Sequence, residues 1–269
     1  MTKDSSRTVT DGQRPRESAL RARFVRWVTQ YLGQIAFLVV LLVFLFVSSP
    51  MFGTTSNLLN VARQVSINMI LSCGMTMVLI IGGIDLSVGA VMALSGMVSA
   101  YLSLSGVPFL LCALAGVLSG VVAGLVNGVI LANTNLPPFI VTYAIQNIIR
   151  GTVYVITGAG TIRLTSAAYL EFGGGSLGPV PLPIIYMVII VALSIVLLAR
   201  TRFGRHMYAL GGNAKAAKFA GINTVRLTLL IYTISGALAG FAGLVLTSRN
   251  SSMQPAVGNG AEMDAIAAV

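Results

Sequence analysis

Charge is what this sequence has least of. Only 9% of its 269 residues are Asp, Glu, Lys or Arg, whereas about 25% is typical of soluble globular chains. Hydrophobic residues make up 56% of the chain. This composition excludes a soluble globular protein and predicts an integral membrane protein.

Side chains that catalyse reactions or bind metals are also scarce. The single histidine, His206, lies in a basic segment with no Cys, Asp or Glu beside it, and the two cysteines, Cys73 and Cys112, lie in apolar runs. No metal site, disulfide framework or nucleophilic triad is therefore predicted. The phosphate-binding pattern G-x-x-x-x-G-K-[ST] does not occur in the sequence, so we expect no catalytic residues, no cofactor and no enzyme.

The positive charge is concentrated in two clusters. Seven of the 17 Lys and Arg residues lie in residues 1–26 and six lie in residues 200–226. Lys and Arg that flank membrane spans stay in the cytoplasm, so the clusters predict topology and not a nucleic-acid partner. The N-terminal region resembles a signal peptide, but its polar leader is thirty residues long and no clear cleavage site follows, which favours an uncleaved first span.

Apolar runs divide the rest of the chain into membrane spans. A span needs roughly 17 to 25 apolar helical residues. Seven runs meet this length, near 31–48, 65–82, 86–104, 108–131, 137–157, 182–199 and 226–247. Six crossings then separate the basic clusters, an even number that puts both on one side. We expect an all-α polytopic helical bundle over 31–269, with a partly disordered cytoplasmic tail over 1–30 and a cytoplasmic loop over 200–225.

Two of these spans carry small residues at regular spacing. Glycine recurs every four residues at Gly116, Gly120, Gly124 and Gly128, and a similar stripe follows at Gly236, Gly240 and Gly243. Such stripes allow the backbones of neighbouring helices to approach closely. We therefore expect them to be packing surfaces.

One aspartate stands alone in the membrane region. Asp85, in the stretch GGIDLSVGAV (82–91), is the only charged residue in 65–104. In one interpretation, Gly82 and Gly83 end a helix with positive φ, and Asp85 caps the next helix by accepting from the amide of Ser87 or Val88. In the other, an ionisable group at membrane depth marks a solute pathway. Both interpretations stay open.

Uncharged polar residues and one arginine also fall within the predicted spans. They are Asn68, Asn127, Thr142, Gln146, Asn147 and Arg150. Each either pairs with a neighbouring helix or lines a solute pathway. The close spacing of Gln146, Asn147 and Arg150 suggests a wet cavity, although Arg150 could also snorkel to the membrane surface.

The basic loop has an order that composition does not explain. It reads RTRFGRHMYALGGNAKAAKFAGIN (200–223). After a Gly-Gly break, residues 213–222 predict one short amphipathic helix that ends at Gly221, with Ala and Phe on one side and two Lys on the other. A helix of this kind outside the membrane could dock on a soluble partner.

Together with GGIDLSVGAVMAL (82–94), LPPFIVTYA (136–144) and SGALAGFAGLVL (235–246), this loop resembles the permease subunits of bacterial ABC importers for ribose and similar monosaccharides (the ribose, xylose and galactose type). The similarity begins near residue 55. It implies a multi-pass protein of the inner membrane that forms a homodimer, receives sugar from a periplasmic binding protein and is driven by a cytoplasmic ATPase.

The resemblance also assigns residues. It implies a turn motif at Gly82, Gly83, Asp85, Ser87 and Gly89. It implies an ATPase-coupling segment at Gly211, Gly212, Asn213, Ala216, Ala217, Gly221 and Ile222.

Two features depart from the family pattern. Gln146 and Asn147 stand where many members carry smaller or hydroxyl side chains, so we expect them to influence which solute is transported. Members also continue beyond MDAIAAV (263–269), so we expect C-terminal spans to be missing here. Two other functions stay open: a secondary, ion-coupled transporter that uses Asp85 as a relay, and a membrane scaffold or receptor.

Overall fold

The structure is a computed structural model that describes residues 16–269. The predicted all-helical, polytopic architecture is confirmed, because these residues form eleven helices and only four strands of two residues each. The chain divides into two compact units, one that ends at Leu58 and one that comprises Leu59–Val269.

The first unit is dominated by α1 (Arg16–Ser48), whose stretch Tyr31–Ser48 is apolar and long enough to cross a membrane. The helix therefore begins well before the predicted span 31–48. Of the tail expected to be partly disordered, residues 16–30 are helical and residues 1–15 lie outside the described chain.

The second unit contains the other elements, apart from the first residues of α2. Their bounds are α2 (Thr55–Ile80), α3 (Val88–Leu104), α4 (Phe109–Asn133), α5 (Pro138–Thr157), β1 (Ile162–Arg163), α6 (Ala167–Gly174), β2 (Ser176–Leu177), β3 (Val180–Pro181), α7 (Leu182–Arg200), α8 (Arg202–Gly212), α9 (Ala214–Phe219), α10 (Thr224–Arg249), β4 (Ser252–Met253) and α11 (Ala261–Ala267).

Length separates α3 from the other predicted spans. Six of the seven correspond to helices long and apolar enough to cross a membrane: α1, α2, α4, α5, α7 and α10. The seventh, 86–104, corresponds to α3, which has 17 residues and a length of about 25 Å. This is less than the roughly 30 Å hydrocarbon thickness of a bilayer, so α3 crosses only together with the chain that precedes it.

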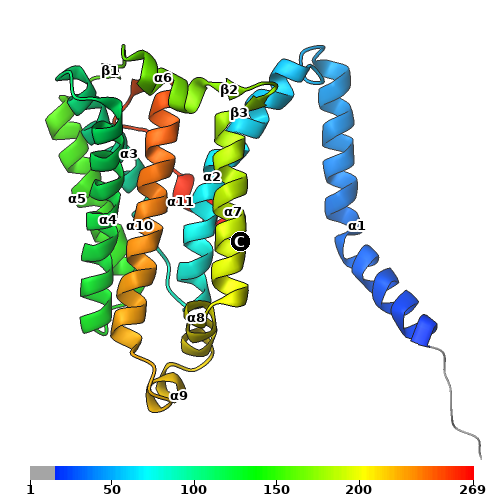
Figure 1. The fold of residues 1–269 in the computed structure, drawn as a ribbon. Helices are drawn as coiled ribbons and strands as arrows, with labels where there is room; N and C mark the ends of the chain where they lie inside the picture. The colour runs from blue at the N-terminus through cyan, green and yellow to red at the C-terminus, as the bar shows by residue number, and fades with distance from the viewer. Residues whose placement is uncertain (1–15) are drawn as a thin grey trace, which may run out of the picture. The chain divides into compact units, whose positions relative to one another are not determined.

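The second unit has two different ends, which Figure 1 shows at the top and bottom of the bundle. At one end, called the α6 end, α6 lies close to β1, which pairs antiparallel with β4. An aromatic cluster there joins Phe172 of α6 to Phe109, Tyr186 and Phe241. At the other end, called the α8 end, the chain after α7 forms α8 and α9 before it re-enters as α10.

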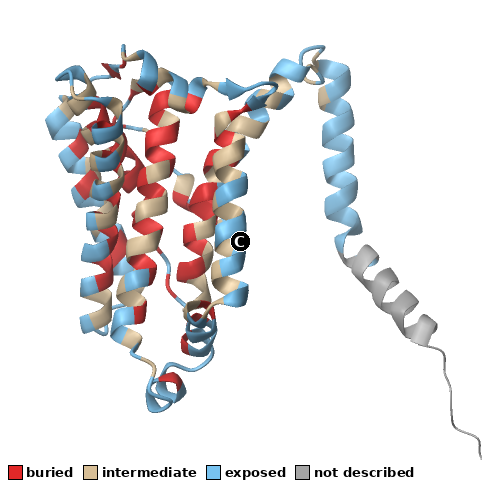
Figure 2. Ribbon diagram, viewed as in Figure 1, coloured by how far each residue is buried: buried red, intermediate tan, exposed pale blue. Residues whose placement is uncertain are grey.

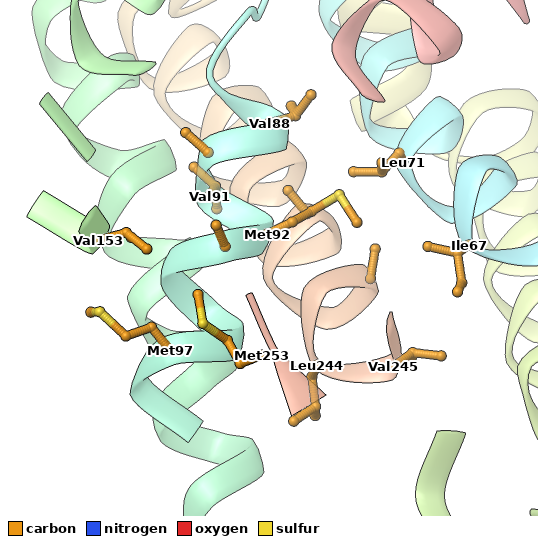
Figure 3. Packing of buried hydrophobic residues seen from close by; sticks show 14 of the residues in the cluster. Ile67, Leu71, Val88, Val91, Met92, Met97, Val153, Leu244, Val245 and Met253 are labelled. Atoms are coloured by element: carbon orange, nitrogen blue, oxygen red, sulfur yellow. The ribbon is translucent and has the colours of Figure 1, made fainter. Parts of the chain in front are cut away.

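Helix α3 forms the centre of the second unit. Eleven of its 17 residues are buried, and α4, α5 and α10 pack around it. Figure 2 shows the buried residues on the inner faces of the helices, and Figure 3 shows Val88, Met92 and Met97 along α3, in the same buried cluster as Leu244 and Val245 of α10. A short helix thus lies inside a wall of longer ones.

The predicted glycine stripes are packing surfaces. A methyl group added at Gly120 would fall on the carbonyl oxygen of Gly236, and one at Gly124 would fall on the carbonyl oxygen of Tyr232. At Gly128 it would lie 2.9 Å from the Cα of Leu229. No residue with a Cβ fits between α4 and α10 at these points, so the prediction is confirmed.

Candidate functional site

The turn after α2 begins with a glycine C-cap. The amide of Gly82 donates to the carbonyl of Leu79 (2.9 Å) and that of Gly83 donates to the carbonyl of Val78 (3.0 Å), the bonding pattern of a Schellman motif. Gly82 has φ +76°, as predicted. The same prediction is wrong for Gly83, whose φ is not positive; a Cβ there would lie 2.5 Å from the Tyr232 hydroxyl, so the two residues are in close contact.

The turn over residues 81–87 begins at the α8 end, where Ile80 meets Gly211, and its last part, 85–87, lies inside the bundle. Asp85 contacts Ser235, eleven residues after α10 begins, and Ser87 contacts Asn127, six residues before α4 ends. At 1.5 Å per residue these points lie about 16 Å and about 9 Å from the α8 end. In Figure 1 the chain accordingly rises from the end of α2 before α3 starts. Unwound backbone at this depth is stable only where protein surrounds it.

The Asp85 carboxylate holds this turn together. Its Oδ1 accepts from the amide (3.0 Å) and the hydroxyl (2.6 Å) of Ser87, and its Oδ2 accepts from the hydroxyl of Ser235 (3.3 Å). The amide contact with Ser87 is one that the sequence predicts, but the N-cap residue of α3 is Ser87, so the prediction that Asp85 itself caps the helix is wrong. Asp85 is only 1% exposed, so these three donors offset the loss of hydration of a buried charge.

Two residues predicted to line a pathway converge on the same turn. The Asn127 amide donates to Ser87 Oγ (2.8 Å), and Thr142 Oγ1 accepts from the amide of Leu86 (3.2 Å). Both side chains are fully buried. In this structure they therefore bind the turn to α4 and α5, and they do not face an open channel.

The other predicted pathway residues have separate surroundings. Asn68 on α2 and Gln146 on α5 are half-buried, while Asn147 is exposed and donates to the Tyr143 carbonyl of its own helix (2.8 Å). Arg150 Nη1 donates to the carbonyls of Pro255 and Val257, both at 2.7 Å. Arg150 is thus bound to the segment after α10 and does not extend to the membrane surface.

The sequence reasoning missed Glu262. This side chain of α11 is 7% exposed, and its Oε2 lies 2.5 Å from the position that a Cβ on Gly89 would occupy. A Cβ there would also fall on the Gly258 carbonyl. A signal was present, because Glu262 follows a glycine-rich stretch and precedes an apolar run, as Asp85 does.

The predicted coupling segment consists of two helices. The predicted helix 213–222 corresponds to the shorter α9, and α8 precedes it. Gly211 and Gly212 end α8, so the chain breaks at Asn213 and not at the glycine pair. The Asn213 side chain accepts from the amide of Ala216 (3.0 Å), and Gly221, with φ +81°, follows the end of α9.

Helix α8 packs directly on the end of α2. A Cβ on Gly211 would fall on the Ile80 carbonyl. Met207 and Leu210 of α8 belong to a buried cluster that also contains Met77, Val78, Leu227, Ile231 and Tyr232. Tyr232 also faces Gly83, so a continuous apolar contact connects α8 with the turn.

The exposed face of α9 differs from the one predicted. Ala217 is 3% exposed, whereas Phe219 is 92% exposed and so lies outward with Lys215, Lys218 and Ala216. Gly212 and Gly221 are also exposed, and Ile222 is half-buried. An almost fully exposed phenylalanine therefore stands at the tip of the basic loop.

Residues 57–269 match the family described as the branched-chain amino acid transport system permease component. The chain belongs to this permease family. It is 42% identical over 244 residues to the ribose import permease protein RbsC of Bacillus subtilis (strain 168), an alignment that covers 90% of this chain and 76% of the relative. The motif resemblance to ribose-type permeases is thereby confirmed.

Two further relatives show the range of the similarity. The D-allose transport system permease protein AlsC of Escherichia coli (strain K12) is 39% identical over 230 residues, which cover 85% of this permease and 71% of AlsC. The galactofuranose transporter permease protein YtfT of the same strain is 35% identical over 269 residues, which cover 95% and 77%. No solved structure matches the permease significantly.

Proposed function

We propose that this chain is the membrane permease subunit of an ATP-driven ABC importer that carries a monosaccharide or a related sugar. The names of its relatives, which import ribose, allose or galactofuranose, support the sugar class. In this proposal ATP hydrolysis occurs in a separate cytoplasmic subunit, a periplasmic binding protein delivers the sugar, and a second copy of the permease completes the pathway.

The contact between α8 and the end of α2 is the observation on which the coupling mechanism rests. Gly211 lies against the Ile80 carbonyl, two residues before the Gly82 turn. Tyr232 belongs to the cluster under α8 and also contacts Gly83. A partner that pushes the α8–α9 loop would therefore displace the turn that carries Asp85, because close-packed interiors transmit strain.

Charge supports a cytoplasmic location for the α8 end. The cations there are Arg200, Arg202, Arg205, Lys215, Lys218 and Arg226, and no acidic residue occurs between Glu171 and Glu262. The α6 end carries Arg63, Arg163 and Arg249 together with the acidic Glu171, and so has fewer cations than the α8 end. Cytoplasmic loops carry the excess of Lys and Arg. If the 81–87 turn and α3 count as one crossing, six crossings precede this loop, so the N-terminus lies in the cytoplasm too.

The solute pathway is proposed near the turn before α3. Asp85, Asn127 and Thr142 meet there, and Asn68, Gln146 and Asn147 supply further polar groups on α2 and α5. Conduction requires binding groups that are polar but weak enough to release the solute. Polar side chains such as the exposed Asn147 are unfavourable against lipid, which supports a second copy or an aqueous path beside α5.

Uptake of labelled D-ribose into proteoliposomes that contain the permease, its ATPase and the binding protein tests the proposal. Phe219→Ala removes the exposed aromatic of α9, and Tyr208→Ala removes another exposed aromatic, 55% exposed on α8, as the matched control. We expect Phe219→Ala to reduce ATP-driven uptake by at least about tenfold, the effect of removing an interface anchor, while Tyr208→Ala has a smaller effect. Uptake that is independent of ATP, or equal in both variants, would contradict the proposal.

A further inference from the structure

Unpaired polar atoms gather around the start of α3. Among the described residues, seven buried side-chain nitrogen or oxygen atoms have no hydrogen-bond partner. Five of them belong to four residues near this turn: Asn127 Oδ1, Tyr232 Oη, Glu262 Oε2, Arg150 Nε and Arg150 Nη2. Buried polar groups are nearly always paired, so such a concentration requires an explanation.

Arg150 and Glu262 are the two members of this group that carry opposite charge. They attract each other electrostatically, yet within the described structure they form no direct ion pair, and each keeps unpaired atoms. Arg150 binds the carbonyls of Pro255 and Val257, next to Gly258, which packs on Gly89. Arg150 therefore binds the loop that packs on Gly89 of α3, and Glu262 lies against Gly89 itself.

The surrounding backbone has the form of two broken helices that approach from opposite ends. Helices α2 and α10 have 26 residues each, and both are followed by a non-helical segment and then a shorter helix. A buried acid accompanies each break: Asp85 lies in the segment before α3, and Glu262 lies in α11. Helix α2 ends against α8, where Gly211 meets Ile80, whereas α10 ends against α6, where Gly173 meets Val245. The broken segments meet at Gly89 and Gly258. Transporters place solute sites where such discontinuous helices meet.

We propose that Arg150 and Glu262 form a binding site for the hydroxyl groups of an uncharged sugar. This inference rests on the proposed function. A hydroxyl group both donates and accepts. Sugar hydroxyl groups can thus donate to Glu262 Oε2 and accept from Arg150 Nη2, the two unpaired atoms, while Arg150 Nη1 keeps its carbonyl partners. The pair has no net charge, so an uncharged solute leaves no buried charge uncompensated.

Direct binding of tritiated D-ribose to the purified full-length permease in detergent, without its partner subunits, tests the site. D-Allose, D-galactose and D-fructose serve as competitors, and L-leucine serves as the competitor from the other solute class. We expect weak, saturable sugar binding that leucine does not displace. Glu262→Gln should weaken it by roughly tenfold or more, the factor expected for a hydrogen bond to a charged group. Glu262→Asp, which keeps the charge, should retain part of the binding.

The matched control is Asp264→Asn, which changes an exposed acid of the same helix. If Glu262→Gln does not fold, labelling of Asn259→Cys by a maleimide in a chain without Cys73 and Cys112 gives a second measurement. Ribose should slow this reaction and leave labelling of Asn133→Cys, at the far end of α4, unchanged.

Three results would overturn the site: equal ribose binding in Glu262→Gln and Asp264→Asn, displacement of ribose by leucine, or no saturable binding of any of the four sugars. These results involve neither ATP nor the α8–α9 loop. ATP-driven uptake can therefore survive the failure of this site, and the site can survive the failure of ATP-driven uptake.

Discussion

The turn over 81–87 and the α8–α9 loop both contain a glycine pair, yet they are held in opposite ways. The turn is bonded to residues far along the chain, since Ser87 binds Asn127 and Asp85 binds Ser235, 150 residues away. In the loop, the Asn213 side chain that caps α9 binds an amide only three residues away, and the Phe219 side chain is exposed. The turn is fixed by its surroundings, whereas the loop keeps its shape locally and presents its surface to a partner.

The two regions nevertheless touch. Gly211 of the loop packs on Ile80, and Tyr232 connects the cluster below α8 with Gly83 of the turn. The α8–α9 loop, which is stabilised locally, can move as a body. It lies against the turn over 81–87, whose hydrogen-bond partners are far away in the sequence. This difference leads us to expect that mutations in the turn change stability, whereas mutations on the loop surface change coupling alone.

The largest expected effect comes from separating α4 and α10, whose glycine-lined contact, here called the seam, encloses the turn. Gly124→Val places a side chain on the Tyr232 carbonyl, so α4 and α10 must separate. We expect a loss of about 3 kcal/mol, the upper part of the range for overpacking, measured by thermal unfolding in detergent. The control is Gly151→Ala on α5, where no atom lies within 4 Å; it should be neutral or stabilising by about 0.5–1 kcal/mol. Similar unfolding temperatures for both variants would show that the seam does not enclose the turn.

The next effect concerns the carboxylate itself. Asp85→Asn keeps the shape but replaces one of the two acceptor oxygens with an NH2 group, so either Ser87 or Ser235 loses its acceptor, and the other oxygen loses its charge. We expect a loss of about 2 kcal/mol in stability, while the uptake that remains still requires ATP. Sugar uptake into proteoliposomes separates the ion-coupled alternative. A transporter that uses Asp85 as a relay would lose all uptake in Asp85→Asn, and its wild-type uptake would respond to a proton gradient.

The smallest effect on stability is expected in the loop. Lys215 and Lys218 are exposed on α9. The double change Lys215→Gln and Lys218→Gln should alter unfolding by less than about 0.5 kcal/mol, and yet weaken binding of the isolated ATPase, with a steeper effect at low salt than at high salt. A large drop in unfolding temperature would remove the contrast between loop and turn.

Periodic features of the sequence predicted much of this structure. The four-residue glycine spacing predicted the α4 and α10 contact, and Gly82 and Gly221 marked helix ends through local backbone chemistry. These signals act over a few residues, so they can be recognised in a single sequence.

Features that depend on distant partners were not predicted. Hydropathy is the same whether α3 begins at the membrane surface or inside the bundle, and only contacts with Asn127 and Ser235 decide it. The outward position of Phe219 and the burial of Ala217 depend on how α9 packs, which six residues do not determine. Glu262 drew no attention because its partner surface, Gly89, lies 173 positions earlier in the chain.

The central claim, that the α8–α9 loop faces the cytoplasm where a motor can push it, is tested most directly by labelling intact cells. Lys215→Cys and Arg163→Cys are each made in a chain in which Cys73 and Cys112 are replaced by alanine, and a membrane-impermeant maleimide is added from outside. The account predicts that Cys at 163, at the α6 end, is labelled and that Cys at 215 reacts only after the cells are opened. Labelling at 215 in intact cells would contradict it.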